Sequence, residues 1–401
     1  MPLTDTHGQS DLPRYFSRVF DVTRDMGHGR LDFVLADGRV FRAEGREPGP
    51  VAELHLHNDE IFARLIREGD LGFCEAYLDQ WWSTPDLMAF LDLVHANEEM
   101  FDGYPGGGIV RAFEKFRFWL QSNSKRQAKK NISHHYDLGN AFYGLWLDDT
   151  MTYSSALFAS GQESLEKAQE LKYASMIDEM GAQPGDHVLE IGCGWGGFAE
   201  YAARERGLRV TGLTISTEQF KYAQERIAKA GLSDKVEFKL QDYRDEKGTY
   251  DGIASIEMFE AVGERYWGTY FDTVKARLKP GKTATLQIIT VQHKRWEIYR
   301  KGVDFIQKYI FPGGMLPSPV VLREEVERAG LEVLRSVEFG ESYSQTLRRW
   351  HETFNARWDE VASLGFDDRF RRMWNFYLAS CAATFHSGNC DVTQITIAKP
   401  A

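Results

Sequence analysis

Short apolar strands alternate with amphipathic helices from about residue 160 onward, and this pattern constrains the fold more than any other feature of the chain. The predicted strands are HVLEIG, LRVTGLTIS, VEFKLQDY, YDGIASIEMFE and TATLQIIT. Strands without a polar face that are joined by helices form a parallel sheet covered on both sides. The pattern therefore predicts a doubly wound, Rossmann-like α/β domain whose ligand site lies beyond the carboxyl ends of the strands.

The first hundred residues predict a smaller domain, mixed in structure and mainly helical. RLDFVLADGRVFRAEG indicates two short strands about an Asp-Gly turn, a dipeptide typical of hairpins. Apolar residues at helical spacing follow over residues 58–82, and we expect Gly69 and Gly72 to interrupt this helix.

A YPGGG stretch that ends at Gly108 is the clearest linker signal in the chain. A chain of 401 residues is also long for a single domain. We therefore predict an N-terminal accessory domain over residues 1–108 and a catalytic domain over residues 109–401.

Net charge and cysteine content disfavour several classes of protein. The formal charge of −11 argues against nucleic-acid binding and repels an anionic membrane on average. The four cysteines form no CxxC pair, which suits a reducing cytosol better than a disulfide-stapled secreted protein. No apolar run reaches the roughly 18 residues that a membrane-spanning helix needs. We expect a cytoplasmic protein that is peripheral on the inner membrane face, and the sequence is compatible with a homodimer.

One basic segment, IVRAFEKFRFWLQSNSKRQAKK (109–130), departs from the acidic character of the chain. Its Lys and Arg side chains are interleaved with aromatic residues, a composition typical of helices that lie on anionic lipid. The alternative is a connecting helix whose aromatic residues pack inward and whose basic residues are merely solvated. We favour the lipid role because an acidic protein that acts on membranes needs a local basic patch.

The loop VLEIGCGWGGF (188–198) lies between a predicted strand and a predicted helix, and its glycines match the GxGxxG pattern of dinucleotide-binding proteins. Two features oppose NAD. The next strand ends in Thr214 and Ser216, where such proteins usually carry a carboxylate for the ribose. In addition, Glu190 would repel a pyrophosphate, whereas it suits a ligand with an ammonium group and no phosphate. S-adenosylmethionine (SAM) has both properties.

The glycines of this loop would let the backbone approach SAM closely. Gln241, Asp242 and Tyr243 follow the third strand, where they would meet the adenine edge and face. The alternative interpretation is a structural turn without a ligand.

Sequence blocks after residue 130 resemble the cyclopropane-fatty-acyl-phospholipid synthases and the related mycolic-acid methyltransferases. The blocks occur in the order of that family and are HHYDLGNAFY, LWLDDTMTYSSALF, EIGCGWGG, LTISTEQ, IEMFEAVGERYWGTYF, YIFPGGMLPS and GESYSQTLRRW. LGFCEAYLDQWWSTPDL is similar to the small N-terminal domain of the phospholipid-acting branch, which the mycolic-acid branch lacks. The resemblance implies a class I SAM-dependent methyltransferase that adds one carbon to the double bond of an unsaturated acyl chain of a membrane phospholipid.

The resemblance also implies which residues form the site. The SAM contacts would be Tyr153, Ser154, Glu190, Gly192, Gly194, Gly196, Thr214, Gln219, Asp242 and Tyr243. A bicarbonate ion would act as the base in such an enzyme, and its ligands would include Glu260 and Tyr343. Two positions depart from the family: the usual cysteine is Ser155, and the usual histidine falls at Gln287. Both side chains still offer hydrogen bonds to an anion.

These two departures leave the product open among a cyclopropane, an exocyclic methylene and a methyl-branched alkene, because the position of the base decides which proton leaves. Aromatic faces can stabilise the carbocation that precedes proton loss. The candidates are Tyr136, Phe142, Tyr153, Tyr266 and Tyr343.

His134 and His135 have no partner at metal-ligand spacing, so we predict no metal site and interpret them as a capping or packing pair. Two rival functions are a small-molecule methyltransferase, which would share the fold, and a lipid-binding protein with a decayed site. An intact glycine loop together with Glu260 and Tyr343 argues against the second.

Overall fold

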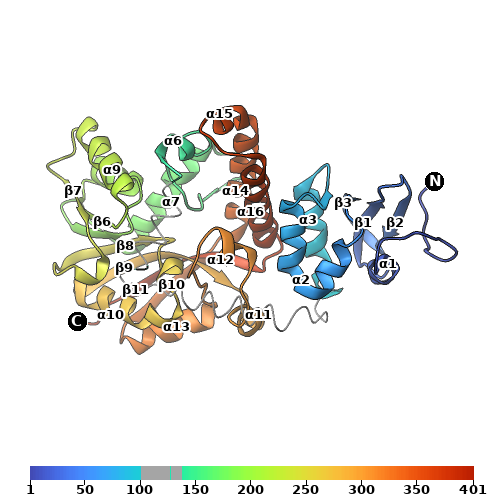
Figure 1. The fold of residues 1–401 in the computed structure, drawn as a ribbon. Coiled ribbons are helices and arrows are strands. Elements are labelled where there is room, and N and C mark those ends of the chain that lie inside the picture. The colour runs from blue at the N-terminus through green and yellow to red at the C-terminus, as the bar shows by residue number, and fades with distance from the viewer. Residues whose placement is uncertain (101–126, 128–137) are drawn as a thin grey trace.

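The computed structural model describes residues 1–100, 127 and 138–401, and within these residues the strands form two sheets (Figure 1). The larger sheet has seven strands in the order β10-β11-β9-β8-β5-β6-β7. Its strands are β5 (His187–Ile191), β6 (Arg209–Thr214), β7 (Val236–Leu240), β8 (Tyr250–Ile256), β9 (Leu278–Val291), β10 (Glu332–Glu338) and β11 (Cys390–Ala398). The five strands predicted from sequence are β5 to β9, and all are present.

The strand order reverses next to β5. From β5 the chain proceeds outward to β6 and β7, and it then returns to β8 on the other side of β5. All of these neighbours are parallel, so the carboxyl ends of β5 and β8 lie side by side. This is the switch point at which doubly wound sheets bind ligands.

The five predicted strands are parallel, as expected, but the sheet also contains a strand that runs the other way. Strand β11 runs antiparallel to both of its neighbours, β9 and β10. It is the last strand in the chain and follows the long helix α16 (Asp368–His386), which brings the chain back to the sheet from its ligand-binding end. A strand entered from that end must run against the others.

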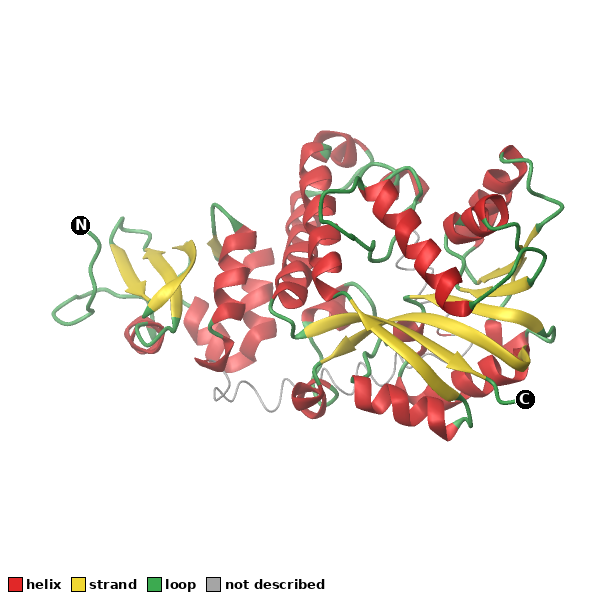
Figure 2. Cartoon of the chain, turned by 180° about the vertical axis from the view of Figure 1, so that it is seen from behind, coloured by secondary structure: helices red, strands yellow, loops and turns green. Residues whose placement is uncertain are grey.

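Helices cover both faces of this sheet (Figures 1 and 2). One face carries α7 (Leu165–Met180), α8 (Gly197–Glu205) and α9 (Thr217–Lys229), and the other carries α10 (Trp267–Arg277) and α13 (Pro319–Arg328). The side chains of Ser164 and Ser216 cap α7 and α9 by accepting a hydrogen bond from the first turn. Each face has its own apolar cluster, so the sheet is buried on both sides, as its apolar strands require.

The N-terminal unit contains the smaller sheet, in the order β2-β1-β3-β4, and three helices. Its elements are α1 (Phe16–Thr23), β1 (His28–Val34), β2 (Val40–Glu44), β3 (Glu47–Leu56), α2 (Ile61–Leu78), β4 (Trp82–Ser83) and α3 (Leu87–Ala96). The predicted hairpin is confirmed, because β1 and β2 pair antiparallel about the Asp-Gly turn. Gly69 interrupts α2 with a φ of 68°, as expected, whereas Gly72 is helical and the predicted break there is wrong.

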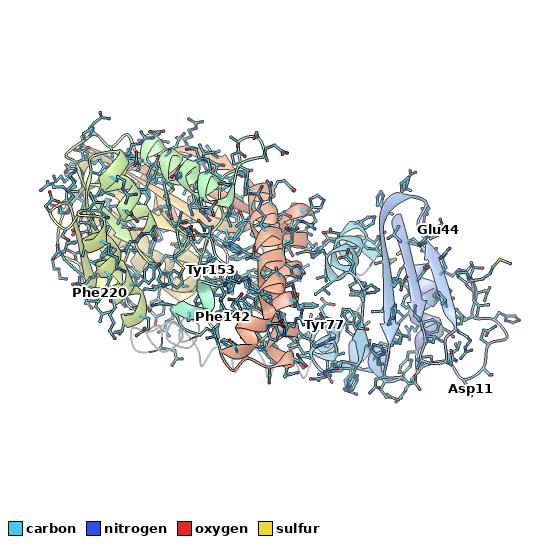
Figure 3. The ribbon with its side chains drawn as sticks, turned by 90° about the horizontal axis from the view of Figure 1, so that it is seen from above. Asp11, Glu44, Tyr77, Phe142, Tyr153 and Phe220 are labelled. Atoms are coloured by element: carbon cyan, nitrogen blue, oxygen red, sulfur yellow. The ribbon has the colours of Figure 1, made fainter. Side chains whose placement is uncertain are left out.

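The N-terminal unit packs on one side of α16, and α6 (Asn140–Tyr143) packs on the other (Figures 1 and 3). Tyr77 contacts the ring of Phe376, with ring centroids 5.6 Å apart, while Phe142 contacts Trp374 at 5.1 Å. Helices α14 (Gly340–Ala356) and α15 (Trp358–Ser363) complete this layer. One apolar cluster therefore runs from the first helix of the chain through α16 to the site.

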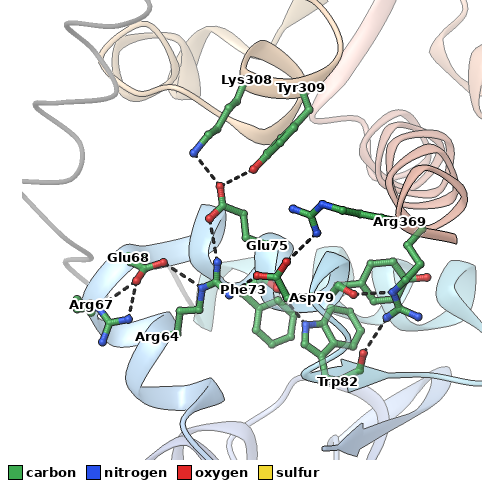
Figure 4. A network of polar contacts seen from close by, with 12 residues as sticks. Arg64, Arg67, Glu68, Phe73, Glu75, Asp79, Trp82, Lys308, Tyr309 and Arg369 are labelled. Carbon is green, nitrogen blue, oxygen red and sulfur yellow. Dashed lines mark hydrogen bonds and ion pairs between the residues drawn. The ribbon is translucent and has the colours of Figure 1, made fainter. Parts of the chain in front are cut away.

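Polar contacts also cross this junction (Figure 4). Glu75 on α2 accepts hydrogen bonds of 2.7 Å from the Lys308 ammonium and the Tyr309 hydroxyl of α12 (Phe305–Tyr309). Arg372 on α16 donates to the backbone carbonyls of Tyr77, at 2.7 Å, and Trp82, at 3.0 Å. Its guanidinium also lies 4.0 Å from the centroid of the Tyr77 ring. The N-terminal unit is thus fixed to the larger domain by specific contacts.

Several predictions fall outside the described residues: the linker before Gly108, the boundary between residues 108 and 109, and nearly all of the basic segment 109–130. His134, His135 and Tyr136 also lie outside them. No helix in the described part of the chain is long and apolar enough to cross a bilayer.

The junction yields a stability prediction. Replacing Arg372 by Met keeps an apolar stem but removes two charge-assisted hydrogen bonds and the contact with Tyr77. We expect the free energy of unfolding in urea to fall by about 1–3 kcal/mol. The control is Arg323→Met on the exposed face of α13, since within the described residues Arg323 pairs with Glu327 alone, at 4.0 Å. Equal unfolding midpoints for the two variants would contradict the proposed contribution of Arg372.

Candidate functional site

A cavity of about 800 Å³ opens where the carboxyl ends of β5 and β8 meet. The loops after β5, β6, β7 and β8 all contribute to its inner wall. Its outer wall comes from α12, α14 and α16 and from the segment that ends near Leu316. The cavity therefore lies at the edge of the sheet that the strand pattern predicted.

The glycines after β5 give this wall its shape. Gly192, Gly194 and Gly196 have φ angles of 85°, 51° and 84°, which L side chains rarely adopt. A Cβ at Gly194 would meet no atom within 4 Å, whereas one at Gly192 would collide with Met258 and one at Gly196 would press on Phe238. Gly192 and Gly194 line the cavity, but Gly196 packs away from it and forms the N-cap of α8. Only Gly194 presents open backbone to a ligand.

Glu190 lies at the end of β5, is 3% exposed and lines the cavity. Its Oε2 atom has no hydrogen-bond partner among the residues that the structure describes. Burial raises the pKa of this carboxyl to about 8, although Lys172 and Arg226 oppose the shift. A cationic ligand beside Glu190 would favour the ionised form and satisfy the orphaned oxygen. The site therefore fits SAM, whose ammonium and sulfonium groups are positive.

The predicted contacts on the far side of the glycine loop all line the cavity. The Thr214 hydroxyl donates to Gln219 Oε1 at 3.0 Å, which orients the amide group of Gln219. Asp242 accepts hydrogen bonds from the Arg244 guanidinium, at 2.8 and 2.6 Å. Tyr243 packs edge-on against Tyr270. These side chains, which lie at the end of β6, on α9 and just after β7, form a polar and aromatic wall beside the loop.

Tyr153 and Ser154 line the opposite wall. The Tyr153 hydroxyl lies 2.7 Å from that of Tyr377 on α16. The Ser154 hydroxyl accepts a 2.7 Å hydrogen bond from Lys172, a lysine that is 0% exposed. A buried lysine, whose pKa burial lowers to about 7, therefore lies behind Ser154.

The four predicted catalytic residues are not equally placed. Glu260 and Tyr343 line the cavity, whereas the lining residues include neither Ser155 nor Gln287, both of which are 0% exposed. Glu260 Oε1 accepts a hydrogen bond from the Ile289 backbone at 2.5 Å, and burial raises its pKa to about 8. The Ser155 hydroxyl is turned to the Ala156 carbonyl, so it does not reach the cavity.

Two buried charges escaped the sequence reasoning. Glu257 follows β8 directly, lines the cavity and lies three residues before Glu260. Lys172 shares the buried face of α7 with Ala168 and Met176. Both residues could have been found from the sequence. Glu257 forms an acidic pair with Glu260 at the end of a strand, and Lys172 lies in a row of apolar residues spaced by four along a helix.

Among the predicted aromatic candidates, Tyr153 and Tyr343 line the cavity. Phe142 is 0% exposed within the aromatic cluster around Trp374, and Tyr266 lies outside the lining residues. Two of the four candidates in the described part of the chain are thus placed to meet a ligand.

The outer part of the cavity reaches the N-terminal unit. Asp70, His95 and Glu98 belong to its lining, together with apolar side chains from α12, α14 and α16. Glu98 is paired with Arg295, which follows β9, and its other oxygen accepts a hydrogen bond from Asn389. The cavity therefore extends from the glycine loop to the junction between the two parts of the chain.

The family model of the mycolic acid cyclopropane synthetases matches residues 123–395 of the chain. The tuberculostearic acid methyltransferase UfaA1 of Mycobacterium tuberculosis is 38% identical over 388 residues, which cover 94% of this chain and 90% of the relative. The cyclopropane-fatty-acyl-phospholipid synthase of Escherichia coli K12 is 37% identical over 351 residues, which cover 87% and 88% of the two chains. A match of that length includes residues of the N-terminal unit.

Solved structures match about two thirds of the chain. Mycolic acid cyclopropane synthase CmaA1, complexed with SAH and CTAB, is 31% identical with a TM-score of 0.63, and the match covers 67% of this chain and 97% of that one. Cyclopropane synthase MmaA2 from Mycobacterium tuberculosis is 29% identical with a TM-score of 0.64, over 68% and 98% of the chains. Coclaurine N-methyltransferase, at 18% identity and a TM-score of 0.64, shares the fold.

The open backbone at Gly194 yields a binding prediction. In Gly194→Val the new side chain would project into the cavity. We expect SAM affinity, measured by calorimetry, to fall more than about tenfold, a loss of roughly 1.4 kcal/mol. The control is Gly231→Val, because Gly231 also has a positive φ, of 68°, and open space around its Cβ but lies outside the cavity lining. Equal SAM affinities in the two variants would show that the glycine loop is only a structural turn.

Proposed function

The chain belongs to the mycolic acid cyclopropane synthetase family and is a SAM-dependent methyltransferase that modifies unsaturated acyl chains; within this activity, we propose that its substrates are acyl chains of membrane phospholipids. The observation that carries the proposal is the continuous cavity. One end carries the glycine loop and a cluster of carboxyl groups, and the other reaches the N-terminal unit. A long acyl chain could lie with its double bond at the inner end.

When bound, SAM supplies a methyl group attached to a positive sulfur, which is the electrophile for an alkene. The protein has to align the two in a site without water, because an alkene is a poor nucleophile. We assign SAM binding to Tyr153, Ser154, Glu190, Gly192, Gly194, Thr214, Gln219, Asp242 and Tyr243. Gly196 instead sets the start of α8.

The rings of Tyr153 and Tyr343 are our candidates for stabilising a carbocation on the acyl chain, since both line the cavity. Glu260 and Tyr343 remain our proposal for the region where a proton is removed. The bicarbonate ion that the family resemblance implies would need free hydrogen-bond donors there. Two donors at these positions, the backbone N–H of Ser155 and the side-chain NH₂ of Gln287, are bonded to Glu257 instead. The donor set therefore does not fit an additional anion.

The N-terminal unit supports a phospholipid rather than a small-molecule substrate. The match to the Escherichia coli cyclopropane-fatty-acyl-phospholipid synthase includes part of this unit, whereas the two cyclopropane synthase structures are matched almost completely by about two thirds of the chain. The likeness to coclaurine N-methyltransferase concerns the fold alone.

A second support is the surface at the mouth of the cavity. Helix α11 (His293–Tyr299) carries the sequence HKRWEIY, and Arg300 and Lys301 follow it. Ile298 is 77% exposed and Lys294 is exposed, and both belong to the cavity lining. An exposed apolar residue with an exposed lysine one helical turn away, here Ile298 and Lys294, is typical of a surface that touches anionic lipid. We propose that this mouth faces the membrane.

The proposed function includes three products: a cyclopropane, an exocyclic methylene and a methyl-branched alkene. The two curated relatives are named for different products and are almost equally identical to this chain, at 38% and 37%.

The substrate class can be tested directly. With SAM and vesicles of a monounsaturated phospholipid, we expect acyl chains that are heavier by one CH₂ group, detected by lipid mass spectrometry. Saturated phospholipid of the same length should gain no mass, because it offers no alkene. Conversion of free fatty acids but not of phospholipids would contradict the proposed substrate.

The membrane surface can be tested separately. In the double variant Lys294→Glu with Ile298→Asp, we expect affinity for anionic vesicles to fall about tenfold or more while SAM affinity is kept, since each basic residue near the surface contributes about 1 kcal/mol. The matched control is Val320→Asp with Arg323→Glu on α13, where Val320 is 44% exposed and both residues lie away from the cavity. If both double variants bind vesicles equally well, α11 is not the membrane contact.

A further inference from the structure

Glu257 stands in an unusual position at the inner end of the cavity. It follows β8 with a φ of 49°, a conformation that non-glycine residues adopt rarely and at a cost of about 1–3 kcal/mol. Its side chain is half-buried and lines the cavity. Backbone strain of this kind persists only where surrounding contacts hold it, and here they can be identified.

Three groups converge on the Glu257 carboxylate. The backbone N–H of Ser155 and the side-chain amide of Gln287 each donate a hydrogen bond of 2.8 Å to the same oxygen, Oε1. The Tyr343 hydroxyl also makes a hydrogen bond to this carboxylate. These are three of the four positions that the family resemblance assigned to the ligands of a bicarbonate ion. In this chain, they surround a carboxylate that belongs to the protein.

A relay of amides fixes the direction of the Gln287 donor. Gln394 on β11 donates to Gln287 Oε1 at 3.1 Å, and the Ser175 hydroxyl donates to Gln394 Oε1 at 2.6 Å. With its oxygen occupied by Gln394, the amide of Gln287 has to turn its NH₂ group toward Glu257. The two residues are also joined through their main chains, because the backbone N–H of Glu257 donates to the backbone carbonyl of Gln287 at 2.8 Å. The glutamine at position 287 is therefore matched to a carboxylate at position 257.

A buried cation supports the ionised carboxylate. Lys172 is 0% exposed and interacts electrostatically with Glu257, Asp148 and Glu190. Burial raises the pKa of Glu257, and Lys172 opposes this shift, as do the hydrogen bonds from Gln287, Ser155 and Tyr343. A carboxylate whose pKa is raised by burial is a stronger base, when ionised, than one in water.

We propose that the Glu257 carboxylate takes the place of an exogenous bicarbonate ion and is the base that removes the proton from the reacting acyl chain. This inference rests on the proposed function. When the alkene π pair bonds to the methyl carbon, the bond from that carbon to sulfur breaks, its electron pair stays on sulfur as a neutral thioether, and the acyl chain is left with a positive charge on the neighbouring carbon. Glu257 takes one C–H proton and becomes a neutral carboxylic acid. The electron pair of that C–H bond closes the cyclopropane ring or forms a new double bond, so no oxidant or reductant is needed.

The competing interpretation is that Glu257 is only the counter-charge of Lys172. Lys172 has other partners, since Asp148 and Glu190 also act on it and its ammonium donates to the Ser154 hydroxyl at 2.7 Å. A counter-charge also needs neither exposure to the cavity nor hydrogen bonds from three different segments. An experiment can separate the two roles because they differ in their response to bicarbonate.

Two variants of Glu257 form the test. Glu257→Gln keeps an oxygen that accepts from Ser155 and Gln287, so it fills the same space but cannot take the proton. Glu257→Gly relieves the positive φ and empties that space while leaving the donors in place. Turnover of monounsaturated phospholipid vesicles is measured in buffer freed of carbon dioxide and again with added bicarbonate. Binding of ¹³C-labelled bicarbonate is followed by NMR in the absence of lipid, and SAM affinity is measured by calorimetry as a check on folding.

We expect wild-type turnover to be independent of bicarbonate and the wild type to bind no labelled ion. Both variants should keep SAM affinity and lose at least about a hundredfold in turnover without bicarbonate, because a positioned base contributes about 10²–10⁴-fold. Added bicarbonate should bind to Glu257→Gly and restore part of its turnover, and it should leave Glu257→Gln unchanged.

The proposal is overturned if wild-type turnover depends on bicarbonate, if the wild type binds the labelled ion, or if Glu257→Gln keeps its turnover. A failure of the proposed function looks different. In that case the wild type converts no phospholipid acyl chain, while the NMR experiment still shows whether the ion enters only when Glu257 is removed.

Discussion

The pairing of β5 with β8 is the constraint on which the rest of the site depends. These parallel neighbours end at the same edge of the sheet, with Ile191 opposite Ser255 in the register. The glycine loop follows one strand, and the acidic pair Glu257 and Glu260 follows the other. A ligand held by the loop must therefore lie against the carboxyl groups. The cavity wall, the orientation of Gln287 and the position of Tyr343 are all arranged around this meeting point.

Buried charge is the main energetic feature of this meeting point. Desolvation raises the pKa of Glu190 and of Glu260 to about 8, and it lowers that of Lys172 to about 7. Charged groups in a poorly solvated site cost stability unless they are paired. Lys172 offsets part of this cost for Glu190 and Glu257, and a cationic ligand would offset more of it. The arrangement suits an enzyme whose cofactor is positive and whose reaction passes through a positive charge.

The N-terminal unit extends this logic from the cofactor to the substrate. It is held on α16 through an apolar cluster and through the hydrogen bonds of Arg372, and it supplies Asp70, His95 and Glu98 to the outer wall of the cavity. The same helix α16 contributes Tyr377, whose hydroxyl lies 2.7 Å from that of Tyr153. One rigid helix thus connects the proposed lipid end of the cavity with the cofactor end.

The sequence by itself determined the strands β5 to β9, the hairpin in the N-terminal unit and the loop with Glu190 and Gly194, because each depends on local periodicity or on a short motif. The antiparallel course of β11, the helical state of Gly72 and the turning of Ser155 away from the cavity were decided by the tertiary structure. The tertiary structure also decided the placement of Glu257, a residue that the sequence analysis did not select, although it selected Glu260. Its carboxylate accepts hydrogen bonds from Ser155, Gln287 and Tyr343. The most distant of these, Ser155, is 102 residues away along the chain. Contacts between such distant segments leave no periodic signal in a sequence, since they arise only when the sheet brings the strand ends together.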